Sequence, residues 1–147
     1  MLKNCISIDP GKYKCGVVLA DIEQKIVLQA IVIESLSLLD LVIDLKKKSN
    51  ISKLIMGGGT TCKEHIESLK ILNDDFIIVN ERNTTLRAKK RYFELFPKKG
   101  LQKLLPKELI IMDMNLDAIS ALIILEDHLN IKFNLGSEVN SKTWMKQ

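Results

Sequence analysis

The chain has 147 residues, of which 46% are hydrophobic and 27% are charged, and its formal net charge is +4 at pH 7. These values are typical of one globular domain with a substantial core. No run approaches the ~20 apolar residues that a membrane span needs, and the N-terminus lacks the cleavage region of a signal peptide. The three cysteines are odd in number and have no metal-type spacing. We therefore expect reduced thiols in a cytoplasmic protein, without a zinc site or a disulfide framework.

Residues 3–9, 14–21 and 25–33 are apolar runs joined by short turns, which predicts an antiparallel meander of three strands. The first run ends in one carboxylate, Asp9, and the Pro10-Gly11 turn follows it. Asp9 is therefore expected where a buried strand meets solvent. Taken alone, an Asp-Pro-Gly sequence is more simply the start of a turn. Only the acids that accompany Asp9 further along the chain favour a functional role.

The middle of the chain alternates helices and strands. The apolar spacing predicts helices over about 37–48 and 61–72 and strands over 53–56 and 76–79, an order typical of parallel strands joined by right-handed crossovers. A helix over about 84–96 is expected next, and a last helix, apolar on nearly all sides, from Asp117 to about Leu129. Residues 131–147 have weak periodicity. The chain is therefore divided into a domain over 1–130 and a loose tail over 131–147.

The positive charge is concentrated in residues 82–107, which contain nine basic residues and one acid, Glu94. The basic residues are Arg82, Arg87, Lys89, Lys90, Arg91, Lys98, Lys99, Lys103 and Lys107. This segment has a net charge of +8, which leaves −4 for the rest of the chain. Such a block favours a polyanionic partner over a merely solvated surface.

Three acids are expected to meet at one edge of the sheet. If the first, fourth and fifth strands are parallel, Asp9 and Glu81 follow strand ends at the edge where open α/β sheets bind ligands. Asp117, at the start of the last helix, is the third candidate. Taken singly, Glu81 is an ordinary loop acid and Asp117 complements the helix dipole. Three converging carboxylates would repel one another, and a divalent cation is the usual remedy.

The loop after the fourth strand is rich in glycine, with Gly57, Gly58 and Gly59 followed by Thr60. It precedes a predicted helix, whose free N–H groups would suit a phosphate. The same glycines would also serve a tight turn without any ligand. The two histidines, His65 and His128, are expected at packing or surface positions.

Together these stretches resemble the YqgF/RuvX family of precursor 16S rRNA nucleases, also described as Holliday-junction resolvase-like, in its cyanobacterial-type variant. The resemblance covers residues 3–130. Its motifs are Ile8-Asp9-Pro10-Gly11 with Cys15-Gly16-Val17, then Glu81-Arg82-Asn83-Thr84-Thr85, and the stretch from Asp117 to Glu126. It implies a ribonuclease H-like α/β fold, with a five-stranded mixed sheet of three antiparallel and two parallel strands flanked by helices.

The resemblance also implies an activity. The family's three acidic active-site positions fall on Asp9, Glu81 and Asp117. They would hold two Mg²⁺ or Mn²⁺ ions for phosphodiester hydrolysis, at the 5′ end of precursor 16S rRNA or at a Holliday junction. The residues expected to bind the RNA or DNA are Gly58, Gly59, Thr60, Arg82, Arg87, Lys89, Lys90 and Arg91. The sequence departs from the family in its shorter glycine loop and in Ala118, where relatives often have a second acid.

Two other functions stay open. One is a catalytically weak or inert nucleic-acid-binding or regulatory module with the same fold. The other follows from the first hairpin, which also looks like the phosphate-binding hairpin of actin-like ATPases, although 147 residues leave no room for the second domain that those enzymes need. The protein is expected to be a monomer or a homodimer.

Overall fold

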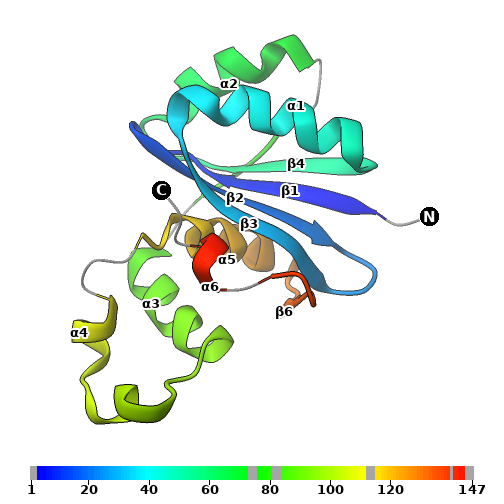
Figure 1. The fold of residues 1–147 in the computed structure, drawn as a ribbon. Coiled ribbons are helices and arrows are strands. Elements are labelled where there is room, and N and C mark those ends of the chain that lie inside the picture. Colours follow the sequence, from blue (N-terminus) through cyan, green and yellow to red (C-terminus); the bar gives the residue numbers. More distant parts are fainter. Residues whose placement is uncertain (1–2, 73–75, 81–83, 112–114, 140, 145–147) are drawn as a thin grey trace.

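The computed structural model describes residues 3–72, 76–80, 84–111, 115–139 and 141–144 (Figure 1). Within these residues the protein is an α/β fold built on a six-stranded mixed sheet, with strand order β5-β4-β1-β2-β3-β6. The strands are β1 (Asn4–Asp9), β2 (Lys14–Asp21), β3 (Ile26–Glu34), β4 (Ile51–Gly57), β5 (Phe76–Val79) and β6 (Asn134–Leu135).

The pairing of the strands confirms the expected mixed sheet. β1, β2 and β3 form the antiparallel meander, and β4 pairs with β1 and β5 with β4 in parallel. The crossovers therefore bring the C-terminal ends of β1, β4 and β5 to one edge. In the ladder Ile8 of β1 is level with Met56 of β4, which is level with Ile78 of β5. The residues that follow each strand consequently emerge side by side.

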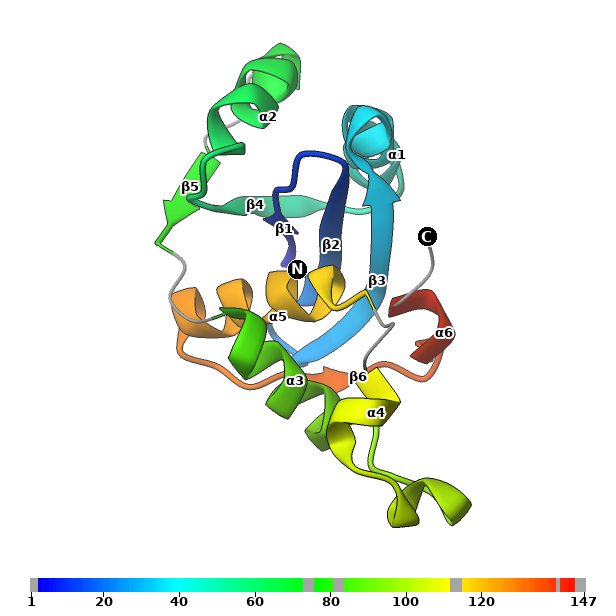
Figure 2. The same cartoon turned by 90° about the vertical axis from the view of Figure 1, so that its left-hand side faces the viewer.

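Helices cover both faces of the sheet (Figure 2). α1 (Leu38–Lys48) and α2 (Cys62–Leu69) lie on one face, and α3 (Thr84–Leu95), α5 (Asp117–Leu129) and α6 (Ser141–Trp144) lie on the other. Three 3₁₀ turns, η1 (Ser35–Ser37), η2 (Lys70–Leu72) and η3 (Gly100–Leu104), and the short helix α4 (Lys107–Ile111) complete the described elements. Among the described helices, none is long and apolar enough to cross a membrane.

The alternation of side chains along β1 separates two cores. Ile6 and Ile8 belong to the core under α1 and α2, whereas Cys5 belongs to the core under α5. The Ser7 hydroxyl, on the α5 face, donates to the Ala121 carbonyl at 2.7 Å. Because successive side chains in a strand point to opposite faces, Asp9 projects to the α5 face as well.

The C-terminal segment differs from the sequence prediction. β6 pairs in parallel with β3 and adds a sixth strand. Phe133 and Trp144 are 1% and 0% exposed, and the Trp144 ring packs edge-on against Phe96 with centroids 5.8 Å apart. The expectation of a loose tail after residue 130 is therefore wrong for these residues. A two-residue strand and a four-residue helix are too short to produce a readable periodicity.

Candidate metal centre and nucleic-acid interface

Asp9 and Asp117 are brought to one corner of the sheet by Gly16. Asp9 is the last residue of β1 and lies directly opposite Gly16 of β2. The Asp9 side chain and the Cβ position of Gly16 therefore face α5. A Cβ atom on Gly16 would lie 1.9 Å from the carbonyl oxygen of Asp117. The first turn of α5 therefore rests directly on Gly16, next to Asp9. We refer to Asp9, Gly16 and Asp117 as the acidic corner.

The electrostatics of the acidic corner favour a cation. Burial raises the pKa of the Asp117 carboxyl, and the nearby positive charge of Lys14 only partly opposes this effect. The negative charges of Asp9 and Asp117 both raise the pKa of the Cys15 thiol, an effect smaller than that of its burial. Both carboxylates thus act on the same stretch of β2. A divalent cation bound at this corner would offset the cost of two partly buried negative charges.

Two of the three predicted metal ligands can be placed. β5 ends at Val79, level with Gly57 of β4 at the edge that carries Asp9. Glu81 and Arg82 lie outside the described residues. Within the described ranges, no three His, Cys, Asp or Glu side chains gather into a metal-binding group. The two carboxylates of the acidic corner nevertheless fit a hard cation, since Mg²⁺ and Mn²⁺ prefer oxygen ligands.

One residue of the glycine loop is hydrogen-bonded to β5, and the next two residues are exposed to solvent. The Gly58 amide donates to the Val79 carbonyl at 2.7 Å, so it is not available to a phosphate. Gly59 and Thr60 are exposed, and a Cβ on Gly59 would meet no atom within 4 Å. Of the three loop residues predicted to bind nucleic acid, Gly59 and Thr60 have the accessibility that such contacts require.

The basic residues of α3 divide into two groups. Lys89 and Lys90 are exposed. Arg87 forms two hydrogen bonds of 2.6 Å with the carboxylate of Asp127, which raise the pKa of Arg87 and lower that of Asp127. Lys89 and Lys90 are therefore the side chains of this helix best placed to meet a phosphate backbone.

Arg91 is buried and paired with other residues of the fold. Its guanidinium is buried and donates to both carboxylate oxygens of the buried Glu126, at 3.1 and 2.7 Å. It also donates to Glu94 and to the Phe133 carbonyl. The prediction that Arg91 binds nucleic acid is therefore corrected, because this arginine joins α3, α5 and the segment before β6. Charge counting along a sequence does not reveal which cations are already paired.

The remaining lysines of the basic segment lie on an arm formed by η3 and α4, which protrudes from the rest of the molecule in both views (Figures 1 and 2). Lys99, Lys103 and Lys107 are exposed there. Leu101 and Leu104, on the same arm, are each 82% exposed. The arm therefore extends the positive surface of the protein beyond α3.

A close thiol–imidazole pair lies on the opposite face of the sheet, where Cys15 Sγ is 3.6 Å from His65 Nε2. Such a pair is the usual arrangement of a cysteine nucleophile and its base. Here the thiol is fully buried, burial raises its pKa, and His65 Nε2 donates instead to the Gly11 carbonyl at 2.8 Å. The pair is therefore inert, and His65 occupies a packing position as predicted.

Comparison of the chain with protein-family models finds no matching family, and comparison with the curated proteins finds no relative.

Proposed function

We propose that the protein is a metal-dependent nuclease with a ribonuclease H-like fold, which hydrolyses phosphodiester bonds in structured RNA or DNA. The acidic corner carries the proposal. In it two acids from separate elements, Asp9 and Asp117, lie next to one close backbone contact at Gly16. Carboxylates held in this way on rigid elements suit hard divalent cations.

The topology supports the fold part of this proposal. A three-stranded antiparallel meander continued by two parallel strands, with helices on both faces, is the arrangement that the resemblance to the YqgF/RuvX family implies. By that resemblance, the substrate is the 5′ end of precursor 16S rRNA, or alternatively a Holliday junction.

In the proposed site, Asp9 and Asp117 are metal ligands and Glu81 completes the set. Mg²⁺ or Mn²⁺ bound there would generate the nucleophile from water and stabilise the leaving oxygen. Lys14 lies close enough to Asp117 to oppose the rise in its pKa. The positive charge of Lys14 would also attract a phosphate group. The exposed Lys89 and Lys90 would hold the nucleic-acid backbone.

The decisive experiment is cleavage of a labelled precursor-rRNA fragment and a four-way DNA junction in Mn²⁺, Mg²⁺ or EDTA. We expect metal-dependent cutting that Asp9→Asn reduces to background, because asparagine keeps the shape but loses the ligand charge. Asp40→Asn, an exposed acid of α1, is the matched control and should cut like wild type. Binding without cutting in every metal would refute the nuclease and favour an inert binding module.

A second prediction concerns the salt dependence of nucleic-acid binding. Each phosphate contact that a lysine makes releases counterions, so the slope of log K against log salt changes by about 0.7–0.9 per contact. Lys89→Gln and Lys90→Gln are each expected to make the slope shallower by about that amount, measured by fluorescence anisotropy between low and moderate salt. Lys47→Gln, on α1 across the sheet, should leave it unchanged. A wild-type affinity that is flat with salt would remove α3 from the binding surface.

A further inference from the structure

The turn between β1 and β2, which directly follows Asp9, is held by side chains from the α1 and α2 side of the sheet. The Gly11 carbonyl accepts hydrogen bonds from Ser35 Oγ and His65 Nε2, both at 2.8 Å. The Pro10 carbonyl accepts one from Thr61 Oγ1 at 3.1 Å. We refer to Ser35, Thr61 and His65 as the turn clamp.

The three clamp residues come from two parts of the fold, η1 and the start of α2. Ser35 begins η1, Thr61 precedes α2, and His65 lies one turn into that helix. They lie 24, 51 and 54 residues from the carbonyls that they bind. Their convergence on two successive carbonyls is therefore a product of the tertiary fold, and it joins η1 and α2 to the strand end that carries Asp9.

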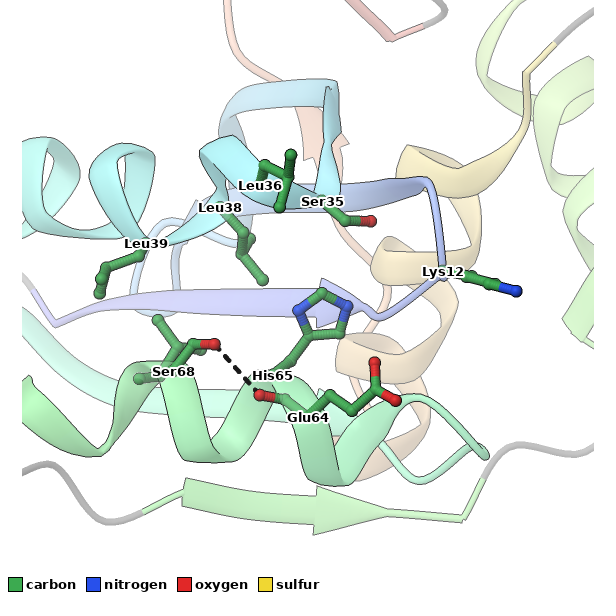
Figure 3. Close-up of a pocket in the computed structure, with 9 residues that line it drawn as sticks. Lys12, Ser35, Leu36, Leu38, Leu39, Glu64, His65 and Ser68 are labelled. Carbon is green, nitrogen blue, oxygen red and sulfur yellow. Dashed lines mark hydrogen bonds between the residues drawn. The ribbon is translucent and has the colours of Figure 1, made fainter.

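His65 is the central member of the clamp. A carbonyl oxygen only accepts hydrogen bonds, so the hydrogen bond to Gly11 places the proton on Nε2. The imidazole is 8% exposed and lines a cavity of about 260 Å³ between α1 and α2, together with Lys12, Glu64 and Ser68 (Figure 3).

Two further hydrogen bonds hold the turn: the Ser35 amide donates to the Tyr13 carbonyl at 2.8 Å, and Cys15 Sγ donates to the Gly11 carbonyl at 3.9 Å. Lys12 is exposed and the Tyr13 side chain is 75% exposed, so neither residue is packed in the core. The backbone of Gly11 lies close to that of Lys14, since a Cβ on Gly11 would lie 2.1 Å from the Lys14 carbonyl oxygen. Exposed turns that join two strands are mobile unless tertiary contacts fix them.

We propose that the turn clamp positions Asp9 for metal binding, and that His65 contributes most to this role. The clamp residues do not act on the substrate; they fix the carbonyls one and two residues beyond Asp9, and so the direction in which β1 presents its last carboxylate. This inference rests on the proposed function, because a rigid Asp9 is useful only as a ligand. Partners that orient a metal ligand are commonly worth 10-fold or more in affinity.

The test compares two substitutions of nearly equal shape in the full chain. His65→Gln places an N–H donor the same number of bonds from Cα as Nε2, and His65→Met has the same length without a donor. Ser68→Ala is the matched control, because Ser68 lines the same cavity but, among the described residues, its hydroxyl donates only to the Glu64 carbonyl of its own helix. Ser35→Ala removes the second bond to Gly11 without opening the α2 packing, and keeps the test valid should His65→Met fail to fold.

Three quantities are measured: backbone order parameters of residues 11–13, the NMR shift of the Asp9 carboxyl carbon without metal, and Mn²⁺ affinity. His65→Met is expected to lower the order parameters from ~0.85 toward ~0.6, to move the Asp9 signal, and to weaken Mn²⁺ binding about tenfold. Ser35→Ala should act in the same direction. His65→Gln and Ser68→Ala should remain near wild type in all three.

Two results would overturn the clamp. One is a His65→Met protein with wild-type order parameters, Asp9 signal and Mn²⁺ affinity. The other is a His65→Gln protein as impaired as His65→Met, which would assign the effect to packing of the ring and not to its N–H. A wild-type protein that binds no Mn²⁺ would instead refute the nuclease, and the clamp would then be judged on the order parameters and the Asp9 signal alone.

Discussion

Replacing Gly16 with alanine is expected to destabilise the protein by about 3 kcal/mol or more and to abolish the proposed metal binding. The added methyl group would lie 1.9 Å from the Asp117 oxygen, 2.1 Å from its carbonyl carbon and 2.6 Å from the Ala118 nitrogen. All three are backbone atoms, so no side-chain rotation relieves the overlap. The first turn of α5 has to move away from β2, and Asp117 moves with it, away from Asp9.

The measurement is thermal unfolding of the metal-free chain, in which about 3 kcal/mol corresponds to a fall in Tm of roughly 6–12 °C. Gly59→Ala is the matched control, because a Cβ there meets no atom within 4 Å and its backbone does not need glycine. We expect its stability within ~0.5 kcal/mol of wild type, since glycine-to-alanine changes at compatible sites are mildly stabilising. An equally stable Gly16→Ala protein would mean that α5 does not rest on β2 as described.

The elements that coincide with continuous apolar runs could be predicted from the sequence. The predicted strand over 76–79 and the helix over 117–129 have the bounds of β5 and α5. The uniform burial expected of the last helix is also confirmed, because residues 118–126 are all buried. Such elements can be recognised locally, since an apolar run and the polar residues that bound it are adjacent in the sequence.

The same local reasoning places Asp9 and Asp117, because strand ends and helix starts are local features. It does not reach contacts between distant residues. Arg91 and Glu126 are 35 residues apart, and His65 and Gly11 are 54 apart. Nothing in the neighbourhood of Arg91 distinguishes it from the exposed Lys90. The pairing of charges and the turn clamp are therefore visible only once the chain is folded.

Asp117→Asn is expected to have opposite effects on activity and on stability. As a proposed metal ligand, Asp117 should be essential, and we expect a loss of cleavage of at least about a hundredfold, since metal stabilisation of the transition state is worth several kcal/mol. The metal-free variant should nevertheless be more stable than wild type near neutral pH. Burial raises the pKa of this carboxyl, so its negative charge is less stable in the folded chain than in the unfolded chain.

The sign of the pH dependence follows from that shift. Below the ordinary aspartate pKa the group is protonated in both states and contributes nothing, whereas above its raised folded pKa the full penalty is present. The stability gained by Asp117→Asn should therefore grow as pH rises from the ordinary aspartate pKa to the raised pKa of the folded chain, and should be constant at higher pH. Each kcal/mol gained would appear as a Tm about 2–4 °C higher. An Asp117→Asn protein that is less stable at every pH would show that the charge is needed in the first turn of α5, as a partner of the helix dipole.

Asp127→Asn, near the other end of α5, provides a control of opposite sign. The hydrogen bonds from Arg87 lower the pKa of Asp127, so its charge stabilises the folded state above the ordinary aspartate pKa and this contribution is lost as pH falls through the lowered value. Because the two side chains are each 43% exposed, the loss should be small, about 0–1 kcal/mol. Cleavage by Asp127→Asn should remain near wild type. One helix would then carry an acid at its start that costs stability and serves the proposed chemistry, and an acid near its end that only stabilises the fold.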